Sequence, residues 1–389
     1  MLPSTPLLFT PGPTPVPESL RQAMSEPTLH HRTPEFESIF AKAREGLLEL
    51  LGMKEVLMLA SSGSGAMEAC VLTFSAKKML SVNSGKFGER FGKIAKAHKI
   101  PYTEIINEWD TPASVESVLE ILQNDKDIDC FCMQMCESAG GLRHPAEAIA
   151  KAIKEYNPNI IVVVDAITAM GVEAIDTSHI DALIGGSQKA FMLPPGLSII
   201  GLSSQAIQKI EERDVGFYFN LKTELKNQVK NTTAWTAPTT IITGLAKYFE
   251  LVSQNESQNG GQSKGQKNGM EQIYKDTKAR SLSTQKALES IGLKIYPKSP
   301  ALAMNTIYDE TNAANLRKVL KTEFNLNVAG GQDRLKTSIV RINQMGLIPL
   351  SQSLWVVNAF ELALQRLGLR DFTGEANKVF LESYYALKA

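Results

Sequence analysis

The stretch IIVVVDAITAMG, residues 160–171, decides the fold. Its β-branched residues run without a polar interruption up to Asp165, which is typical of a strand buried on both faces of a parallel sheet. Ligands of open α/β sheets bind at the carboxyl ends of such strands, where Asp165 lies. An acid in this place can also serve only as a turn or helix cap, so this stretch alone leaves its role open.

A second stretch, ALIGGSQKAFMLPPG at residues 182–196, places a lysine at the end of another predicted strand. Lys189 follows an apolar run and precedes two prolines that enforce an extended turn. A loop lysine is usually a solvated charge, but one held near buried apolar surface becomes a neutral nucleophile, as a Schiff-base lysine requires. The pattern therefore indicates two candidate reactive groups, Asp165 and Lys189, at one edge of the sheet.

A third stretch, SSGSGAMEA at residues 61–69, predicts a turn from a strand into a helix. Gly63, Ser64 and Gly65 would lie at the helix N-terminus, where free backbone N–H groups and the positive end of the helix dipole bind anions. The stretch lacks the lysine of a nucleotide-triphosphate loop. Such a turn can also be ordinary turn chemistry, and the residues alone leave phosphate binding open.

Around these stretches, short apolar runs alternate with amphipathic helical stretches. This alternation is typical of βαβ units and predicts an α/β fold with a mostly parallel sheet. Helices are expected at 35–51 and at 145–155, the second opened by a proline in its first turn. Strands are predicted at 56–61, 79–83, 128–135, 160–165, 181–185 and 197–202.

The composition changes abruptly at residues 253–269, which contain no aliphatic or aromatic residue. Because such a stretch buries too little apolar surface to offset its ordering entropy, we predict a flexible polar insertion there. Beyond it, helices at 270–290, 311–323 and 350–367 alternate with strands near 291–297, 302–308 and 336–343. The expected organisation is an N-terminal arm near the active site, a large domain, the insertion and a small α+β domain, at residues 1–15, 16–252, 253–269 and 270–389.

Composition excludes several classes of function. The 389 residues carry 41 Lys+Arg against 41 Asp+Glu, so the net charge gives no argument for a nucleic-acid or anionic-membrane binder. No signal peptide or apolar run of about 20 residues is visible. The few cysteines form no disulfide framework and no metal set, so we expect buried structural thiols, no metal and a cytoplasmic location; they are Cys70, Cys130, Cys132 and Cys136.

Eight motifs follow one another along nearly the whole chain: FTPGPTPVP (9–17), HHRTPEF (30–36), SSGSGAMEA (61–69), NSGKFGER (83–90), CESAGG (136–141), VVDAITAMG (163–171), GSQKAFMLPPG (186–196) and VRINQMG (340–346). Together they resemble the class V, fold-type I pyridoxal phosphate enzymes, specifically the small aminotransferases of the alanine–glyoxylate and serine–pyruvate kind. The resemblance implies a large domain with a mostly parallel seven-stranded sheet sandwiched by helices, a smaller C-terminal domain, and bound pyridoxal 5'-phosphate.

The resemblance also implies roles for single residues. Lys189 would form the Schiff base with the cofactor, Asp165 would hold the pyridine nitrogen, and Phe87 would stack on the ring. Further cofactor contacts are implied for Gly63, Ser64, Gly65, Ser138, Gln188 and Thr236. Thr236 lies in a loop that in relatives reaches the neighbouring subunit's phosphate site, which implies a homodimer with shared active sites. Substrate contacts are implied for Gly12, Arg32 and Arg341, of which Arg341 would hold the carboxylate.

The implied reaction is transamination between alanine or serine and a 2-oxo acid, glyoxylate or pyruvate. HHR at 30–32 also resembles the His-Arg pair with which phosphoserine aminotransferases grip the substrate phosphate or the 2-oxoglutarate side chain. Phosphoserine:2-oxoglutarate transamination in serine biosynthesis is therefore an alternative. A cysteine desulfurase-like lyase is a further alternative, but it needs a mobile thiolate from the carboxyl-terminal half, and no cysteine follows Cys136.

Overall fold

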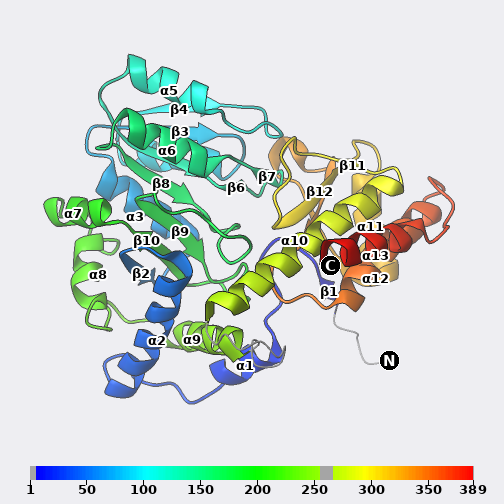
Figure 1. Cartoon of the computed structure of the whole chain (residues 1–389), viewed down its shortest axis with the longest axis horizontal. Coiled ribbons are helices and arrows are strands. Elements are labelled where there is room, and N and C mark those ends of the chain that lie inside the picture. The colour runs from blue at the N-terminus through cyan, green and yellow to red at the C-terminus, as the bar shows by residue number, and fades with distance from the viewer. Residues whose placement is uncertain (1–5, 255–265, 389) are drawn as a thin grey trace.

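The computed structural model describes residues 6–254 and 266–388 (Figure 1). Its central sheet has seven strands, and all neighbours run parallel except β10, which is antiparallel to both strands beside it. The predicted mostly parallel seven-stranded sheet is confirmed. In spatial order the strands are β2 (Glu55–Leu59), β10 (Ser198–Leu202), β9 (Ala182–Gly186), β8 (Ile161–Asp165), β5 (Ile128–Gln134), β3 (Lys78–Asn83) and β4 (Tyr102–Ile106).

Strand β8 lies in the middle of the sheet and is buried along its whole length. Val162 and Val164 face one apolar core, while Ile161 and Val163 face the other. Helices cover both faces of the sheet, which gives three layers. One face packs against α2 (Pro34–Leu51), α5 (Val115–Asn124), α6 (Ala146–Tyr156) and α9 (Thr239–Gln254), and the other against α3 (Gly63–Phe74), α4 (Gly88–Ala97), α7 (Ser204–Glu212) and α8 (Leu221–Gln228).

A second, four-stranded antiparallel sheet belongs to the last third of the chain and has its own apolar core. Helix α10 contributes Met270 and Ile273 to the large core, and Ala287 and Leu288 to this smaller one. Figure 1 shows α10 extending from the large sheet toward the small one. The elements are α10 (Gln266–Ser290), β11 (Lys294–Ile295), β12 (Met304–Tyr308), α11 (Ala313–Phe324), β14 (Ala329–Gly330), β15 (Ile339–Asn343), α12 (Leu350–Arg366) and α13 (Glu375–Lys388).

The structure differs from the sequence-based expectations in several elements. Strand β4 is an edge strand with mostly half-buried residues, and helix α13 follows a further turn after α12; neither is predicted above. Where the polar insertion is predicted, the structure has helix at both ends, because α9 runs to Gln254 and α10 begins at Gln266. Gln266 is buried and its Nε2 donates to the Gly46 carbonyl at 2.6 Å, which anchors that start. The rest of the predicted insertion lies outside the described residues.

The N-terminal arm runs from the small sheet's side to the large sheet. Strand β1 (Leu7–Leu8) pairs in parallel with β13 (Leu326–Asn327), and Phe9 is buried in the smaller core. The carbonyl of Pro11 then accepts a hydrogen bond from Lys189, at the end of the large sheet. The arm therefore joins the two sheets at the predicted site. No helix among the residues described is long and apolar enough to cross a membrane.

Candidate active site

One cavity lies where the carboxyl ends of β5, β8 and β9 meet the loops that follow them, and its volume is about 250 Å³. This is the place at which open α/β sheets bind ligands. Ser62, Arg90, Cys136 and Thr168 also contribute to its wall. Most of the residues predicted for cofactor or substrate line it, namely Gly12, Gly63, Ser64, Phe87, Ser138, Asp165, Gln188 and Lys189.

Lys189 lies in the connection between β9 and β10. The turn is closed by Ser187, whose hydroxyl donates to the Pro194 carbonyl at 2.6 Å and whose backbone N–H donates to the Leu197 carbonyl at 3.0 Å. The Nζ of Lys189 donates to the Pro11 carbonyl at 2.5 Å. Burial lowers the pKa of Lys189 from 10.5 to about 8. The amine is therefore neutral, and nucleophilic, at a much lower pH than a solvated lysine.

Asp165 is the last residue of β8, and its Oδ1 accepts the backbone N–H of Ile167 at 2.9 Å. Burial raises the pKa of Asp165 to about 6. The Ile167 N–H and the charges of Arg90 and Lys189 act in the opposite direction and favour the ionised form. The cavity thus contains a carboxylate that is ionised above about pH 6, in a setting that screens its charge little.

The N-terminus of α3 forms one wall of the cavity. A Cβ added to Gly63 would lie 2.2 Å from Ile167 Cδ1, so a side chain here would require the Ile167 side chain to move. The Ser64 hydroxyl accepts a hydrogen bond from Arg90 Nη1 at 2.9 Å, and the Arg90 guanidinium carbon lies 4.8 Å from the centroid of the Phe87 ring. Free N–H groups at a helix start, beside a guanidinium, form a cradle suited to an anion.

Arg341 lies on β15 and adjoins the cavity through Ser138. Its Nη1 donates to the Ser138 carbonyl at 2.6 Å, and its Nε donates to the Gly330 carbonyl at 2.8 Å. Burial lowers the pKa of Arg341 to about 10, while the nearby charge of Glu137 acts to raise it. The guanidinium therefore stays cationic near neutral pH, and two backbone carbonyls fix its plane.

Besides Arg341, which only adjoins the cavity, three predicted residues do not line it. Gly65 lies within the first turn of α3, where an added Cβ would be 2.6 Å from Ser61 Oγ. Arg32 is exposed in the loop before α2, and its backbone N–H donates to His30 Nδ1 at 3.3 Å. Thr236 is also exposed and lines a separate small hollow. Arg32 and Thr236 therefore lie apart from the groups around Lys189, whereas Gly65 belongs to the same helix start as Gly63 and Ser64.

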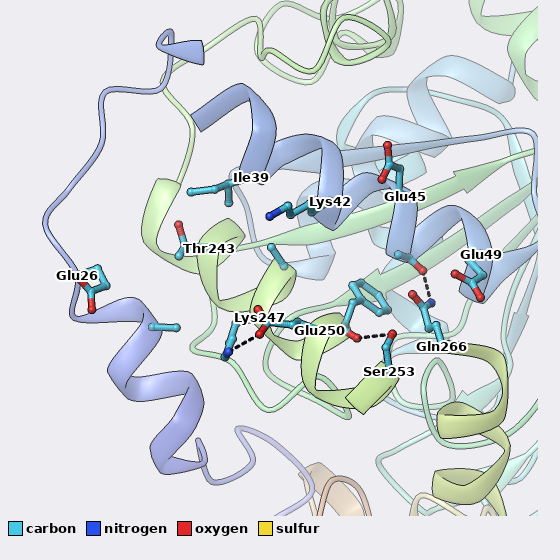
Figure 2. Close-up of a pocket in the computed structure, with 14 residues that line it drawn as sticks. Glu26, Ile39, Lys42, Glu45, Glu49, Thr243, Lys247, Glu250, Ser253 and Gln266 are labelled. Atoms are coloured by element: carbon cyan, nitrogen blue, oxygen red, sulfur yellow. Dashed lines mark hydrogen bonds and ion pairs between the residues drawn. The ribbon is translucent and has the colours of Figure 1, made fainter. Parts of the chain in front are cut away.

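A larger hollow, of about 490 Å³, lies between α1 (Glu18–Met24), α2 and α9 (Figure 2). None of the residues predicted for cofactor or substrate lines it. Lys247 on its wall is paired with Glu250, Nζ to Oε1, at 2.7 Å. Its remaining charged residues are Glu26, Lys42, Glu45 and Glu49. The volume of a cavity alone would therefore not identify the active site, because the smaller cavity around Lys189 contains the reactive side chains.

The structure adds three residues that sequence reasoning did not single out, two of which, Arg90 and Glu137, lie in the quoted motifs. Arg90 reaches the cavity from α4, Gln134 donates from its Nε2 to the Phe87 carbonyl at 2.8 Å, and Glu137 is fully buried next to Ser138. The place of Glu137 in the motif CESAGG, directly before Ser138, is the one signal in the sequence that could have found it. The other two sit at ordinary polar positions.

The family follows from a comparison with known proteins. The family model described as "Aminotransferase class-V" matches residues 7–359, which include every residue of the cavity. The chain belongs to the class V aminotransferases. Enzymes of this family use pyridoxal phosphate for transamination. The aminotransferase fits this cofactor, because its cavity combines an amine of lowered pKa, a carboxylate, an aromatic ring and an anion cradle.

Relatives of the aminotransferase cover almost the whole chain. An "Uncharacterized aminotransferase" of Helicobacter pylori (strain ATCC 700392 / 26695) is 55% identical over 98% of this chain and 100% of the relative. The "L-aspartate--glyoxylate aminotransferase" of Paracoccus denitrificans is 26% identical over 93% of this chain and 92% of its own length. The solved structure of an aspartate aminotransferase of Thermus thermophilus superposes with a TM-score of 0.83 at 28% identity, covering 92% of this chain and 99% of its own.

Proposed function

We propose that this aminotransferase moves the amino group of a small amino acid, alanine or serine, to a 2-oxo acid such as glyoxylate or pyruvate. The proposal is carried by Arg341, whose guanidinium adjoins the cavity through Ser138 and would bind the substrate carboxylate, while Arg32 lies exposed outside the cavity. A donor with one carboxylate needs one such partner. The Paracoccus relative is named for L-aspartate and glyoxylate; its glyoxylate supports a small 2-oxo acid as acceptor, whereas its L-aspartate does not support alanine or serine as donor.

Each proposed catalytic residue has a task that its surroundings support. Pyridoxal phosphate, when bound, supplies an electron sink that stabilises negative charge at the substrate Cα. The Asp165 carboxylate would keep a proton on the ring nitrogen, and the Lys189 amine would hold the cofactor covalently and then move a proton at the substrate Cα. Arg341 would bind the substrate carboxylate and so fix the direction of the Cα–H bond.

The cofactor's own contacts complete the proposal. The N-terminus of α3 with Gly63, Ser64 and Gly65 would hold the phosphate, together with Gln188 from the turn before Lys189. Phe87 would cover one face of the ring and Ser138 would lie beside its phenolic oxygen. Their common position around one cavity of about 250 Å³ supports these roles, except for Gly65, which would contribute only as part of the helix start.

We also propose a homodimer in which Thr236 reaches the partner's site. Thr236 is exposed beside a cluster of aromatic rings: the Trp235 ring lies 5.0 Å from that of Phe217 and 5.9 Å from that of Tyr218. Phe217 is 79% exposed, which is unusual for a phenylalanine and is typical of an interface. Sedimentation at micromolar concentration should give a dimer, and a fully active monomer would contradict this.

The alternative is phosphoserine transamination, with Arg32 as a phosphate ligand. It is favoured by the exposed HHR segment, because an exposed arginine in a dimer could enter the partner's site. Both functions use the same cofactor and differ only in the substrate's second anion. The fold therefore does not distinguish the two functions, and only the identity of the amino donor does.

The deciding experiment is a set of half-reactions. The purified holoenzyme is mixed separately with alanine, serine, aspartate, phosphoserine and glutamate, and the loss of the cofactor's visible absorbance is followed. We expect alanine or serine to react fastest. Fastest reaction with phosphoserine or glutamate would establish the alternative, and no reaction with any of them would reject transamination of these donors.

A further inference from the structure

Glu137 is a fully buried glutamate beside the cavity, and the mechanism above gives it no task. Its Oε2 accepts the backbone N–H of Phe87 at 3.0 Å and of Gly88 at 2.8 Å, and its Oε1 accepts that of Ala139 at 2.9 Å. Burial raises the pKa of Glu137 to about 7, but three N–H donors favour the ionised carboxylate. The carboxylate therefore ties the segment around Phe87 to the turn that carries Ser138.

The segment tied by Glu137 is the start of α4. This helix begins at Gly88, and no side chain from its own first turn or from Phe87 caps it. Glu137 therefore satisfies N–H groups that a local cap would otherwise take, and its charge suits the positive end of the helix. On the other side of the same residue, the Phe87 carbonyl accepts Gln134 Nε2 at 2.8 Å. Two buried side chains thus hold the Phe87 backbone at its N–H and at its carbonyl.

The glycines of SGKFG, residues 84–88, allow this close approach. A Cβ added to Gly85 would lie 2.6 Å from Glu137 Cδ, and one added to Gly88 would lie 2.7 Å from the Val82 carbonyl oxygen. Such distances are shorter than real Cβ contacts, so a side chain at Gly85 would displace the Glu137 carboxylate, and one at Gly88 would push the segment away from the backbone of Val82. The chain is therefore built to bring the Phe87 segment directly against the Glu137 carboxylate.

We propose that Glu137 is a positioning residue, which fixes the Phe87 ring against the cofactor and thereby sets cofactor affinity. The inference rests on the cofactor site proposed above. A carboxylate that only caps α4 would stabilise the fold and leave cofactor binding unchanged. Cofactor affinity therefore distinguishes positioning of Phe87 from simple capping of α4, whereas thermal stability does not.

Glu361 offers a matched control. It is also fully buried, and its carboxylate accepts the N–H of Thr373 at 3.0 Å and of Ala376 at 3.2 Å, at the start of α13. Neither partner lines the cavity. Glu361→Gln therefore removes the same kind of charged acceptor from a helix start without touching the Phe87 segment.

The test compares Glu137→Gln with Glu361→Gln. Both should lower the melting temperature by similar amounts. Only Glu137→Gln should raise the apparent dissociation constant for pyridoxal phosphate, by about tenfold, because a charge-assisted hydrogen bond to the Phe87 segment is lost. It should also weaken the visible circular dichroism of the bound cofactor, which reports how rigidly the ring is held. Equal cofactor affinity and dichroism in the two variants would overturn the proposal.

A cycle with Phe87→Ala tests whether Glu137 acts through the ring. In that background, adding Glu137→Gln should change the dissociation constant less than about twofold, because no ring remains to be positioned. A full additional tenfold loss would overturn the proposal. If Glu137→Gln does not fold, Gly85→Ala displaces the same carboxylate without removing its charge, and it should weaken binding in the same dependent way. If the wild-type protein itself takes up no pyridoxal phosphate, the proposed function fails first, and with it this inference.

Discussion

The residues proposed for the reaction fall into two groups that differ in where they lie. Lys189, Asp165 and Phe87 surround one cavity at the strand ends, with pKa shifts caused by burial at the first two. Arg32 and Thr236 are exposed on loops outside it. The first group can act within one chain, whereas the second can act only if another molecule brings a site to it. The difference separates the residues that one chain brings together from those that would need a partner subunit.

The largest effect is expected at Lys189. Lys189→Ala should lower kcat by at least about a thousandfold, because the covalent hold on the cofactor and the proton transfer are both lost. The variant should also lose the visible absorbance of the lysine-bound cofactor. Steady-state transamination at the wild-type rate would reject the assignment. Lys154→Ala is a control, because Lys154 is a partly buried lysine paired with Asp181 away from the cavity, and it should keep both signals.

A smaller loss is expected at Asp165, the other member of the cavity group. Asp165→Asn keeps the size of the side chain but removes its charge, so the proton on the ring nitrogen is held less strongly. We expect the cofactor to remain bound and kcat to fall by about a hundredfold, the usual effect of removing one well-placed electrostatic contact. Absorbance measures the bound cofactor and steady-state assays give kcat. Wild-type turnover would show that another residue holds that proton.

The sequence predicts an element well when contacts between residues close in the chain determine it, and poorly when contacts between distant residues do. Strand β8 and the strand before Lys189 are continuous apolar runs, so their positions are readable locally, and the sheet then forces Asp165 and Lys189 together. Strand β4 lies at the edge and is mostly half-buried, so its sequence lacks that signal. The roles of Phe87, Ser138 and Gln188 came only from the resemblance.

Glu137 shows the limit more sharply. Two of its three partners are backbone N–H groups about 50 residues earlier in the chain, and backbone groups leave no mark in the sequence. Only the fold brings them together. The same holds for Arg341, whose guanidinium plane is set by the carbonyls of Ser138 and Gly330, from two other parts of the chain.

Arg341 connects the two groups, because it adjoins the cavity and would bind substrate. Arg341→Lys keeps the charge but loses the planar, two-pronged contact with a carboxylate, so we expect kcat/KM to fall about tenfold or more for every donor. Arg280→Lys is the control: Arg280 is buried and donates to the carbonyls of Gln344 and Gly346, at 2.6 and 3.1 Å, and neither of these partners lines the cavity, whereas Ser138, the partner of Arg341, does. Equal losses in the two variants would mean that Arg341 acts only through packing.

The smallest effect is expected at Arg32, and it decides between the two donors. If alanine or serine is the donor, one carboxylate needs a partner, so Arg32→Ala should change kcat/KM for alanine less than about threefold. If phosphoserine is the donor, its phosphate loses a charge-assisted contact, and kcat/KM for phosphoserine should fall about tenfold or more. The comparison of both donors in one variant removes any general effect on folding. Arg21→Ala, at an exposed arginine paired with Glu18, controls for the loss of surface charge. An equal small loss on both donors rejects the phosphoserine function, and a selective loss on phosphoserine would overturn the proposed one and place Arg32 in a partner's site.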